Sequence, residues 1–115
     1  MSVTLYGIPN CDTVKKARVW LDQHGIAYAF HDYKKVGIDA AHLSRWVAEA
    51  GLDKVLNRAG TTFLKLPEAS RQELDEARAI ALMIAQPSCI KRPVVEHAHG
   101  LLVGFKPADW EAALS

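Results

Sequence analysis

Residues 5–13 read Leu5-Tyr6-Gly7-Ile8-Pro9-Asn10-Cys11-Asp12-Thr13, a short apolar segment that breaks at a turn just before a cysteine. Residues 3–6 are typical of a buried strand, which Gly7 and Pro9 end. Residues 12–24 carry apolar side chains at helical spacing, which predicts a helix beginning directly after Cys11. Unpartnered N–H groups and the positive end of the helix dipole favour the thiolate of a cysteine placed there. The alternative is that Cys11 packs as a small buried hydrophobe.

The pattern around this segment extends to further strands. Residues 27–33 predict a second strand, and a strand–helix–strand unit of this length favours two parallel neighbours. Residues 90–96 and 101–105 predict two more strands, joined by a hairpin-like connection at 97–100. Pro107 suits the first turn of a terminal helix.

The middle of the chain is predicted to be helical, with turns between its segments. The elements expected there are a helix at 39–50 with Asp39 as its N-cap, a helical turn at 52–56, a polar loop at 57–62, and a helix that Ser70 opens with Glu73 at capping-box spacing and that Pro87 ends.

The composition is that of one globular domain over residues 1–115, half apolar and 23% charged. A formal net charge of +1 gives no bulk attraction to nucleic acid or to an anionic membrane. No apolar run approaches the roughly 20 residues of a membrane span, and we expect no signal peptide. Because two cysteines are too few for a disulfide scaffold, a reducing cytoplasm is the expected location.

Three segments together resemble the arsenate reductase (ArsC) family, specifically its YffB/Spx-like branch. They are residues 6–17 around Cys11, residues 56–61 around Arg58, and residues 90–95 around Arg92 followed by 103–105. The resemblance covers nearly the full length. It implies an α/β thioredoxin-like fold with a mixed four-stranded sheet in the order βαβ…ββα. A helical insertion at about 38–88 would lie between the second and third strands.

The resemblance also implies roles for single residues. Cys11 corresponds to the nucleophile, Arg58 and Arg92 to arginines that bind the anionic substrate, and Pro93 to a cis proline. From the residues alone, a solvated loop charge is the alternative for Arg58, and an edge-strand charge that deters aggregation is the alternative for Arg92. Asn10, beside the cysteine, and Lys15, one helical turn beyond it, complete the predicted substrate-binding set.

Two positions depart from the family pattern. Lys106 stands where arsenate reductases of this kind carry a third arginine, and a lysine lacks the bidentate grip of a guanidinium. Val14 stands where Spx-type regulators hold a second cysteine. An outside thiol, which we expect to be glutathione, would therefore resolve an adduct on Cys11; Cys89 is the alternative within the chain.

The sequence thus predicts a glutathione-dependent thiol/disulfide reductase with a single cysteine nucleophile. The alternatives are an Spx-like regulator that binds RNA polymerase and a true arsenate reductase. Glutathione and glutaredoxin are the expected partners, with no bound cofactor and no direct contact with nucleic acid or membrane. His97 and His99 lack the further ligands of a metal site, so no metal is predicted.

Overall fold

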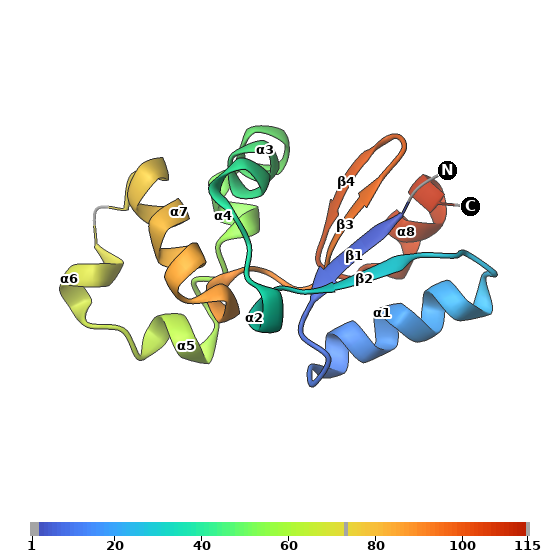
Figure 1. Cartoon of the computed structure of the whole chain (residues 1–115), viewed down its shortest axis with the longest axis horizontal. Helices are drawn as coiled ribbons and strands as arrows, with labels where there is room; N and C mark the ends of the chain where they lie inside the picture. Colours follow the sequence, from blue (N-terminus) through green and yellow to red (C-terminus); the bar gives the residue numbers. More distant parts are fainter. Residues whose placement is uncertain (1–2, 73, 115) are drawn as a thin grey trace. The chain divides into compact units, whose positions relative to one another are not determined.

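A mixed sheet organises the first of two units into which the computed structural model divides (Figure 1). The structure describes residues 3–72 and 74–114. Of these, residues 3–36 and 92–114 form the first unit, and Gly37–Lys91 forms the second. The predicted insertion at about 38–88 falls inside the second unit.

The strands lie in the order β2-β1-β3-β4 and produce the predicted mixed topology. β1 (Thr4–Gly7) pairs in parallel with β2 (Ala29–Asp32) and antiparallel with β3 (Val94–His97), which pairs antiparallel with β4 (Gly100–Val103). The parallel pair arises because α1 (Asp12–Gln23) carries the chain back to the start of the sheet before β2 begins. The two-residue connection between β3 and β4 confirms the predicted hairpin.

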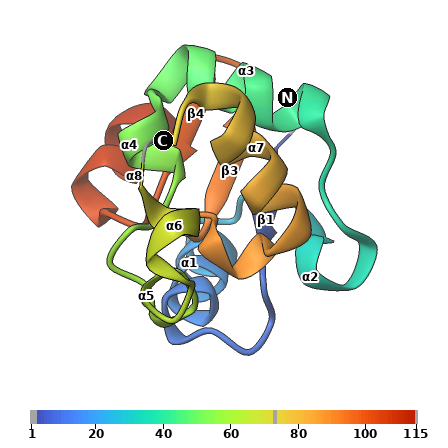
Figure 2. The same cartoon turned by 90° about the vertical axis from the view of Figure 1, so that its left-hand side faces the viewer.

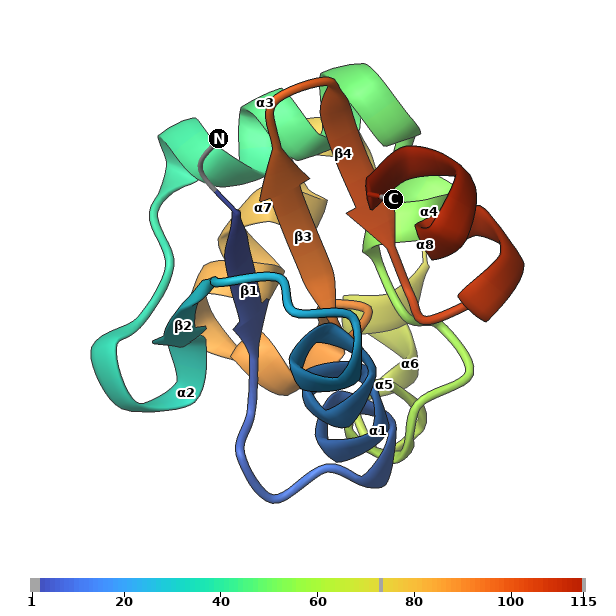
Figure 3. The same cartoon turned by 90° about the vertical axis from the view of Figure 1, so that its right-hand side faces the viewer.

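The core of the first unit lies between this sheet and two helices, α1 and α8 (Pro107–Leu114), which cover one face of the strands (Figure 3). The apolar positions predicted on α1 are buried there, and Trp110 of α8 is fully enclosed. The buried side chains of this cluster are Val3, Leu5, Val14, Ala17, Trp20, Leu21, Val95 and Trp110.

The second unit consists of short helices (Figure 2). They are α3 (Ala40–Ala50), α4 (Leu52–Val55), α5 (Thr61–Leu64), α6 (Glu68–Arg71), α7 (Glu76–Ala85) and the 3-10 turn η1 (Pro87–Cys89). Helix α3 packs against α4 and α7, while η1 contacts α5 and α7. The large side chains that fill this unit are Leu43, Trp46, Leu56, Phe63, Met83 and Ile90.

Two short segments, residues 55–57 and 89–91, pair through their backbones at the two ends of the stretch between α4 and η1. Leu56 and Ile90 form an antiparallel bridge. The amide of Asn57 donates to the carbonyl of Cys89 at 2.7 Å, and the amide of Lys91 donates to the carbonyl of Val55 at 2.8 Å. Residues 55–57 and 89–91 therefore run side by side, although residues 58–88 lie between them in the sequence.

Several predicted boundaries are confirmed and others shift for local reasons. The Asp39 carboxylate accepts from the amide of His42 at 2.8 Å, which confirms Asp39 as the N-cap of α3. β2 ends at Asp32 rather than at 33, because the Asp32 carboxylate accepts from the amides of Lys34 and Lys35 and starts the short helix α2 (Tyr33–Val36).

The two C-terminal strands are shorter than predicted. Residues 90–93 do not join the sheet as strand, since Ile90 bridges to Leu56 and Pro93 has no N–H to donate. β4 ends at Val103 because Gly104 adopts a positive φ of 81°, which turns the chain out of the extended conformation.

Two predictions in the middle of the chain were wrong. The loop expected at 57–62 ends at Gly60, since Thr61 and Thr62 already belong to α5 and the amide of Leu64 donates to the Gly60 carbonyl. Ser70 lies within α6 and does not open α7, which begins at Glu76 with Asp75 as its N-cap. Glu73, the predicted partner of Ser70, lies outside the described residues.

Candidate active site at the start of helix α1

Cys11 stands at the junction of loop and helix, as the sequence predicts. It is the N-cap residue of α1, with extended backbone angles of −132° and 125°, and its carbonyl accepts the first helical hydrogen bond from the amide of Lys15 at 2.9 Å. Its side chain makes no capping hydrogen bond, is partly exposed, and packs by its inner side against the core cluster. A thiol in this position is accessible to a reagent and close to the positive end of a twelve-residue helix.

The approach of β1 to α1 fixes this junction. A Cβ atom added at Gly7 would lie 2.9 Å from a methyl group of Val14, which is itself fully buried. Only a glycine at the end of β1 therefore allows the first turn of α1 to pack this closely against the strand. The close packing holds Cys11 at the carboxyl edge of the sheet.

Tyr33 interacts electrostatically with both Cys11 and Arg92. Its side chain is completely buried at the start of α2, and burial raises the pKa of its hydroxyl above the usual value. The Arg92 charge opposes this rise, while the Cys11 and Asp32 charges add to it, so both Arg92 and Cys11 lie within electrostatic range of Tyr33. Three residues distant in sequence thus share one region of the first unit.

The residues flanking Arg92 agree with the expected geometry. The Arg92–Pro93 peptide is cis, which confirms the isomer that the family resemblance implied for Pro93. Pro93 is buried, and its carbonyl accepts from the amide of Gly104 at 2.8 Å. Arg92 is half-buried at the point where the chain enters β3.

The other predicted binding residues lie in two places. Asn10 is exposed in the loop before Cys11, and Lys15 is exposed on α1 one turn beyond it. Arg58 belongs to the second unit, where its guanidinium lies 3.5 Å from the Asp53 carboxylate on the surface. The role of Arg58 therefore stays a prediction.

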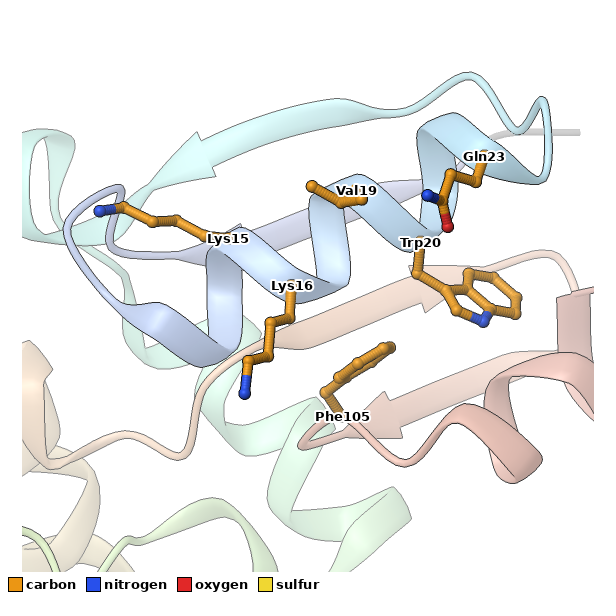
Figure 4. A pocket seen from close by; sticks show the side chains of 6 residues that line it. All are labelled: Lys15, Lys16, Val19, Trp20, Gln23 and Phe105. Carbon is orange, nitrogen blue, oxygen red and sulfur yellow. The ribbon is translucent and has the colours of Figure 1, made fainter.

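A shallow groove of about 310 Å³ runs along the outer side of α1 (Figure 4). Lys15 and Lys16 stand at the end nearer Cys11 and Gln23 at the other, with Val19, Trp20 and Phe105 between them. Val19 is 52% exposed, which is high for an apolar side chain on a packed helix. The groove offers an apolar surface with two cations at one end.

The second cysteine differs sharply from the first. Cys89 lies in η1 of the second unit and is 1% exposed, and neither cysteine is in a disulfide. A buried thiol is inert toward reagents in solution. The two thiols should therefore differ in reactivity in the folded protein.

The described part of the chain contains no group of three or more His, Cys, Asp or Glu side chains placed to hold a metal ion. His97 ends β3, and its ring nitrogen Nδ1 accepts from the amide of His99 in the hairpin turn. In the same residues, no helix is both long and apolar enough to cross a membrane.

Sequence reasoning missed Tyr33 as a site residue. The signal that was available is Asp32, whose carboxylate commonly ends a strand by binding the amides that follow it. Because β2 ends at Asp32, Tyr33 is the first residue of α2 and not part of the strand. The proximity of Arg92 to Tyr33 depends on the sheet topology, which cannot be read from residue spacing in the sequence.

The raised pKa of Tyr33 predicts a loss of stability in alkali. In the unfolded chain a tyrosine loses its proton near pH 10, whereas native Tyr33 keeps it, so the free energy of unfolding falls as pH rises above 10. We expect this group to contribute a fall of about 1.4 kcal/mol per pH unit above pH 10. Urea denaturation of the wild type and of Tyr33→Phe at pH 9, 10 and 11 measures the difference in slope. Parallel slopes for the two proteins would contradict the assignment.

The comparisons with known proteins agree with this fold, which is that of a thioredoxin-like protein with a cysteine at the start of its first helix. The ArsC family model matches residues 6–113, and the chain belongs to the ArsC family. A solved structure named YFFB protein is 64% identical, with 99% of this chain and 100% of that chain covered and a TM-score of 0.96.

Two further relatives mark the range of the family. An arsenate reductase (ArsC) related protein from Brucella melitensis, solved in solution, is 61% identical, with 97% of this chain and 93% of that chain covered and a TM-score of 0.77. The global transcriptional regulator Spx of Streptococcus mutans is 26% identical over 114 residues, which are 97% of this chain and 82% of that protein. The chain is thus related both to arsenate reductases and to Spx regulators.

Proposed function

We propose that this chain is a glutathione-dependent thiol/disulfide reductase and that Cys11 is its nucleophile. The observation that carries the proposal is the position of Cys11 at the N-terminus of α1, partly exposed, with Arg92 and Cys11 both in electrostatic range of the buried Tyr33. An accessible thiol at a helix N-terminus, with a cation in the same region of the fold, suits attack on the sulfur of an anionic disulfide.

The proposed reaction uses one cysteine and two molecules of glutathione. The Cys11 thiolate attacks the glutathione sulfur of a mixed disulfide, forms a Cys11–glutathione disulfide and releases the other thiol, which takes up a proton. The thiolate of a second glutathione then attacks the glutathione sulfur of this adduct. Glutathione disulfide leaves, and Cys11 returns to the thiolate. The other sulfur of the substrate disulfide is reduced to a thiol, the sulfur of the second glutathione is oxidised, and the first glutathione sulfur stays in a disulfide throughout.

The burial of Val14 and of Cys89 supports the proposal that an outside thiol resolves the adduct on Cys11. Val14 occupies the position one turn along α1 at which a resolving cysteine would stand, and it is fully buried. Cys89 is enclosed in the second unit. We therefore propose free glutathione as the reductant. Glutaredoxin is the alternative reductant of the adduct on Cys11.

The flanking residues have positioning and binding roles in this proposal. Arg92 would bind a glutathione carboxylate, and Pro93 would hold the chain beside the Cys11 sulfur for the incoming disulfide. Asn10 and Lys15 flank Cys11 along the chain, and both are exposed to an arriving ligand. Charge-assisted hydrogen bonds of this kind orient an anion more strongly than neutral ones.

A coupled assay tests the proposal. The protein is incubated with the mixed disulfide of glutathione and 2-mercaptoethanol, excess glutathione, NADPH and glutathione reductase, and NADPH oxidation is followed. We expect a rate that is proportional to protein concentration and saturates with the disulfide. A rate that never exceeds the protein-free background would overturn the proposal.

Replacing Arg92 should weaken binding more than folding. We expect Arg92→Ala to raise KM for the glutathione mixed disulfide about tenfold, because one charge-assisted hydrogen bond contributes about 1.5 kcal/mol. Arg92→Lys is the matched control, and it should fall between Ala and wild type because it keeps the charge without the planar fork. If KM stays at the wild-type value while the urea midpoint collapses, Arg92 is structural.

A regulator is the second candidate function, and the relationship to Spx of Streptococcus mutans is what favours it. In that role the chain would contact RNA polymerase without turnover at Cys11. Co-purification of RNA polymerase with both the wild type and Cys11→Ser, together with no activity in the coupled assay, would favour the regulator.

A further inference from the structure

A second pocket, of about 330 Å³, lies between the loop that precedes Cys11 and the segment at the end of β2. One wall is formed by Ile8, Pro9 and Asn10, from the loop that joins β1 to α1. The opposite wall is formed by Asp32, Lys34 and Lys35, at the end of β2 and in α2. All six residues belong to the first unit.

Both walls of this pocket adjoin Cys11. Asn10 is bonded directly to Cys11 in the chain, so their Cα atoms are about 3.8 Å apart. Tyr33, which stands between the residues of the other wall, is in electrostatic range of Cys11. The parallel strands β1 and β2 end at the same edge of the sheet, which brings the two walls together. The pocket therefore lies at the same edge of the sheet as Cys11, and the residue before Cys11 is part of its lining.

The charges lining the pocket are of both signs and are held in place. The amides of Lys34 and Lys35 donate to the same oxygen of the Asp32 carboxylate, at 3.1 and 3.2 Å, which fixes this carboxylate at the pocket wall. The side chains of Lys34 and Lys35 are exposed, and both residues line the pocket together with Asp32. One carboxylate and two ammonium groups lining the same pocket complement a ligand group that carries an ammonium and a carboxylate on one carbon.

We propose that this pocket is the subsite for the γ-glutamyl end of glutathione; the inference rests on the proposed function and names where that co-substrate binds. The α-ammonium group pairs with Asp32, and the α-carboxylate pairs with Lys34 and Lys35. In glutathione this zwitterionic end lies about two residue lengths from the sulfur, on the order of 7 Å. Such a span is of the length needed to reach from the Cys11 sulfur into a pocket whose lining includes the preceding residue, Asn10.

The test compares two disulfides that differ only in the γ-glutamyl group. Formation of the Cys11 adduct is timed by mass spectrometry with glutathione disulfide and with cysteinylglycine disulfide, for the wild type and for Lys34→Gln/Lys35→Gln. The control is Lys54→Gln/Lys65→Gln, which changes net charge equally at exposed positions outside the pocket. Alkylation of Cys11 by iodoacetamide, an uncharged reagent, reports the state of the thiol in each variant.

We expect Lys34→Gln/Lys35→Gln to slow the reaction with glutathione disulfide tenfold or more, and the reaction with cysteinylglycine disulfide less than twofold. The control variant should change both rates less than twofold. Equal slowing with both disulfides, or equal slowing in the control, overturns this inference and leaves the proposed function standing. If glutathione disulfide fails to react with wild-type Cys11 while iodoacetamide reacts, the proposed function fails, and this inference fails with it.

Discussion

Cys11→Ser is expected to reduce turnover to the background rate, a loss of roughly a thousandfold or more, while the protein stays folded. A serine hydroxyl cannot form the disulfide with glutathione on which both proposed steps depend. The Cys11 side chain makes no capping hydrogen bond, so the substitution removes none from α1. The coupled assay gives the rate, and the far-ultraviolet circular dichroism spectrum and urea midpoint report the fold.

Cys89→Ala is the matched control for this result. Cys89 is buried in the second unit, and alanine keeps that position small and apolar. We expect Cys89→Ala to retain turnover and iodoacetamide to label one thiol in the native protein and two after unfolding. Turnover by Cys11→Ser would refute the nucleophile, whereas loss of turnover in a folded Cys89→Ala would identify Cys89 as the resolving thiol.

Trp110→Ala is expected to cost about 3–5 kcal/mol of unfolding free energy, the range for removing a buried aromatic side chain. Trp110 is fully buried, and its ring meets those of Trp20 at 5.6 Å and Phe105 at 4.8 Å between centroids, both edge to face. Its indole nitrogen donates to the carbonyl of Gly104 at 3.1 Å. Urea denaturation followed by circular dichroism measures the shift of the midpoint.

Trp110→Phe separates the two contributions and stays informative if the alanine variant does not fold. Phenylalanine keeps much of the aromatic packing and loses the hydrogen bond to Gly104. The carbonyl is then left without this donor, so we expect a smaller loss of about 1–3 kcal/mol. A loss below about 0.5 kcal/mol in both variants would show that Trp110 is not central to the core.

The part of the fold that follows local rules was predictable from the sequence. The strand, the turn and the helix after Cys11 have strong signals, namely an apolar run, Gly7 and Pro9, and helical spacing. The helical turn at 52–56 was predicted and is α4, whereas the other four-residue helices α2, α5 and α6 were not, because one turn is too short to show a period. The capping-box pattern at Ser70 competed with Asp75, and the structure uses Asp75.

The site was predictable only in part, for a different reason. Cys11 is identified by its local context, whereas Arg92 and Pro93 came from the resemblance to the ArsC family. Tyr33 and the pocket around Asp32 arise from the meeting of two strand ends, which only the pairing of β1 with β2 reveals. Electrostatic contact between residues this far apart in sequence has no periodic signature.

The backbone pairing of residues 55–57 with 89–91 has a consequence for the length of the stretch between them. Because residues 55–57 and 89–91 are joined by backbone groups, the junction does not depend on the side chains enclosed between them. The entropy cost of closing such a loop grows only slowly with its length. A change in the length of the stretch between residues 57 and 89 should therefore cost little entropy while the two segments at its ends stay paired.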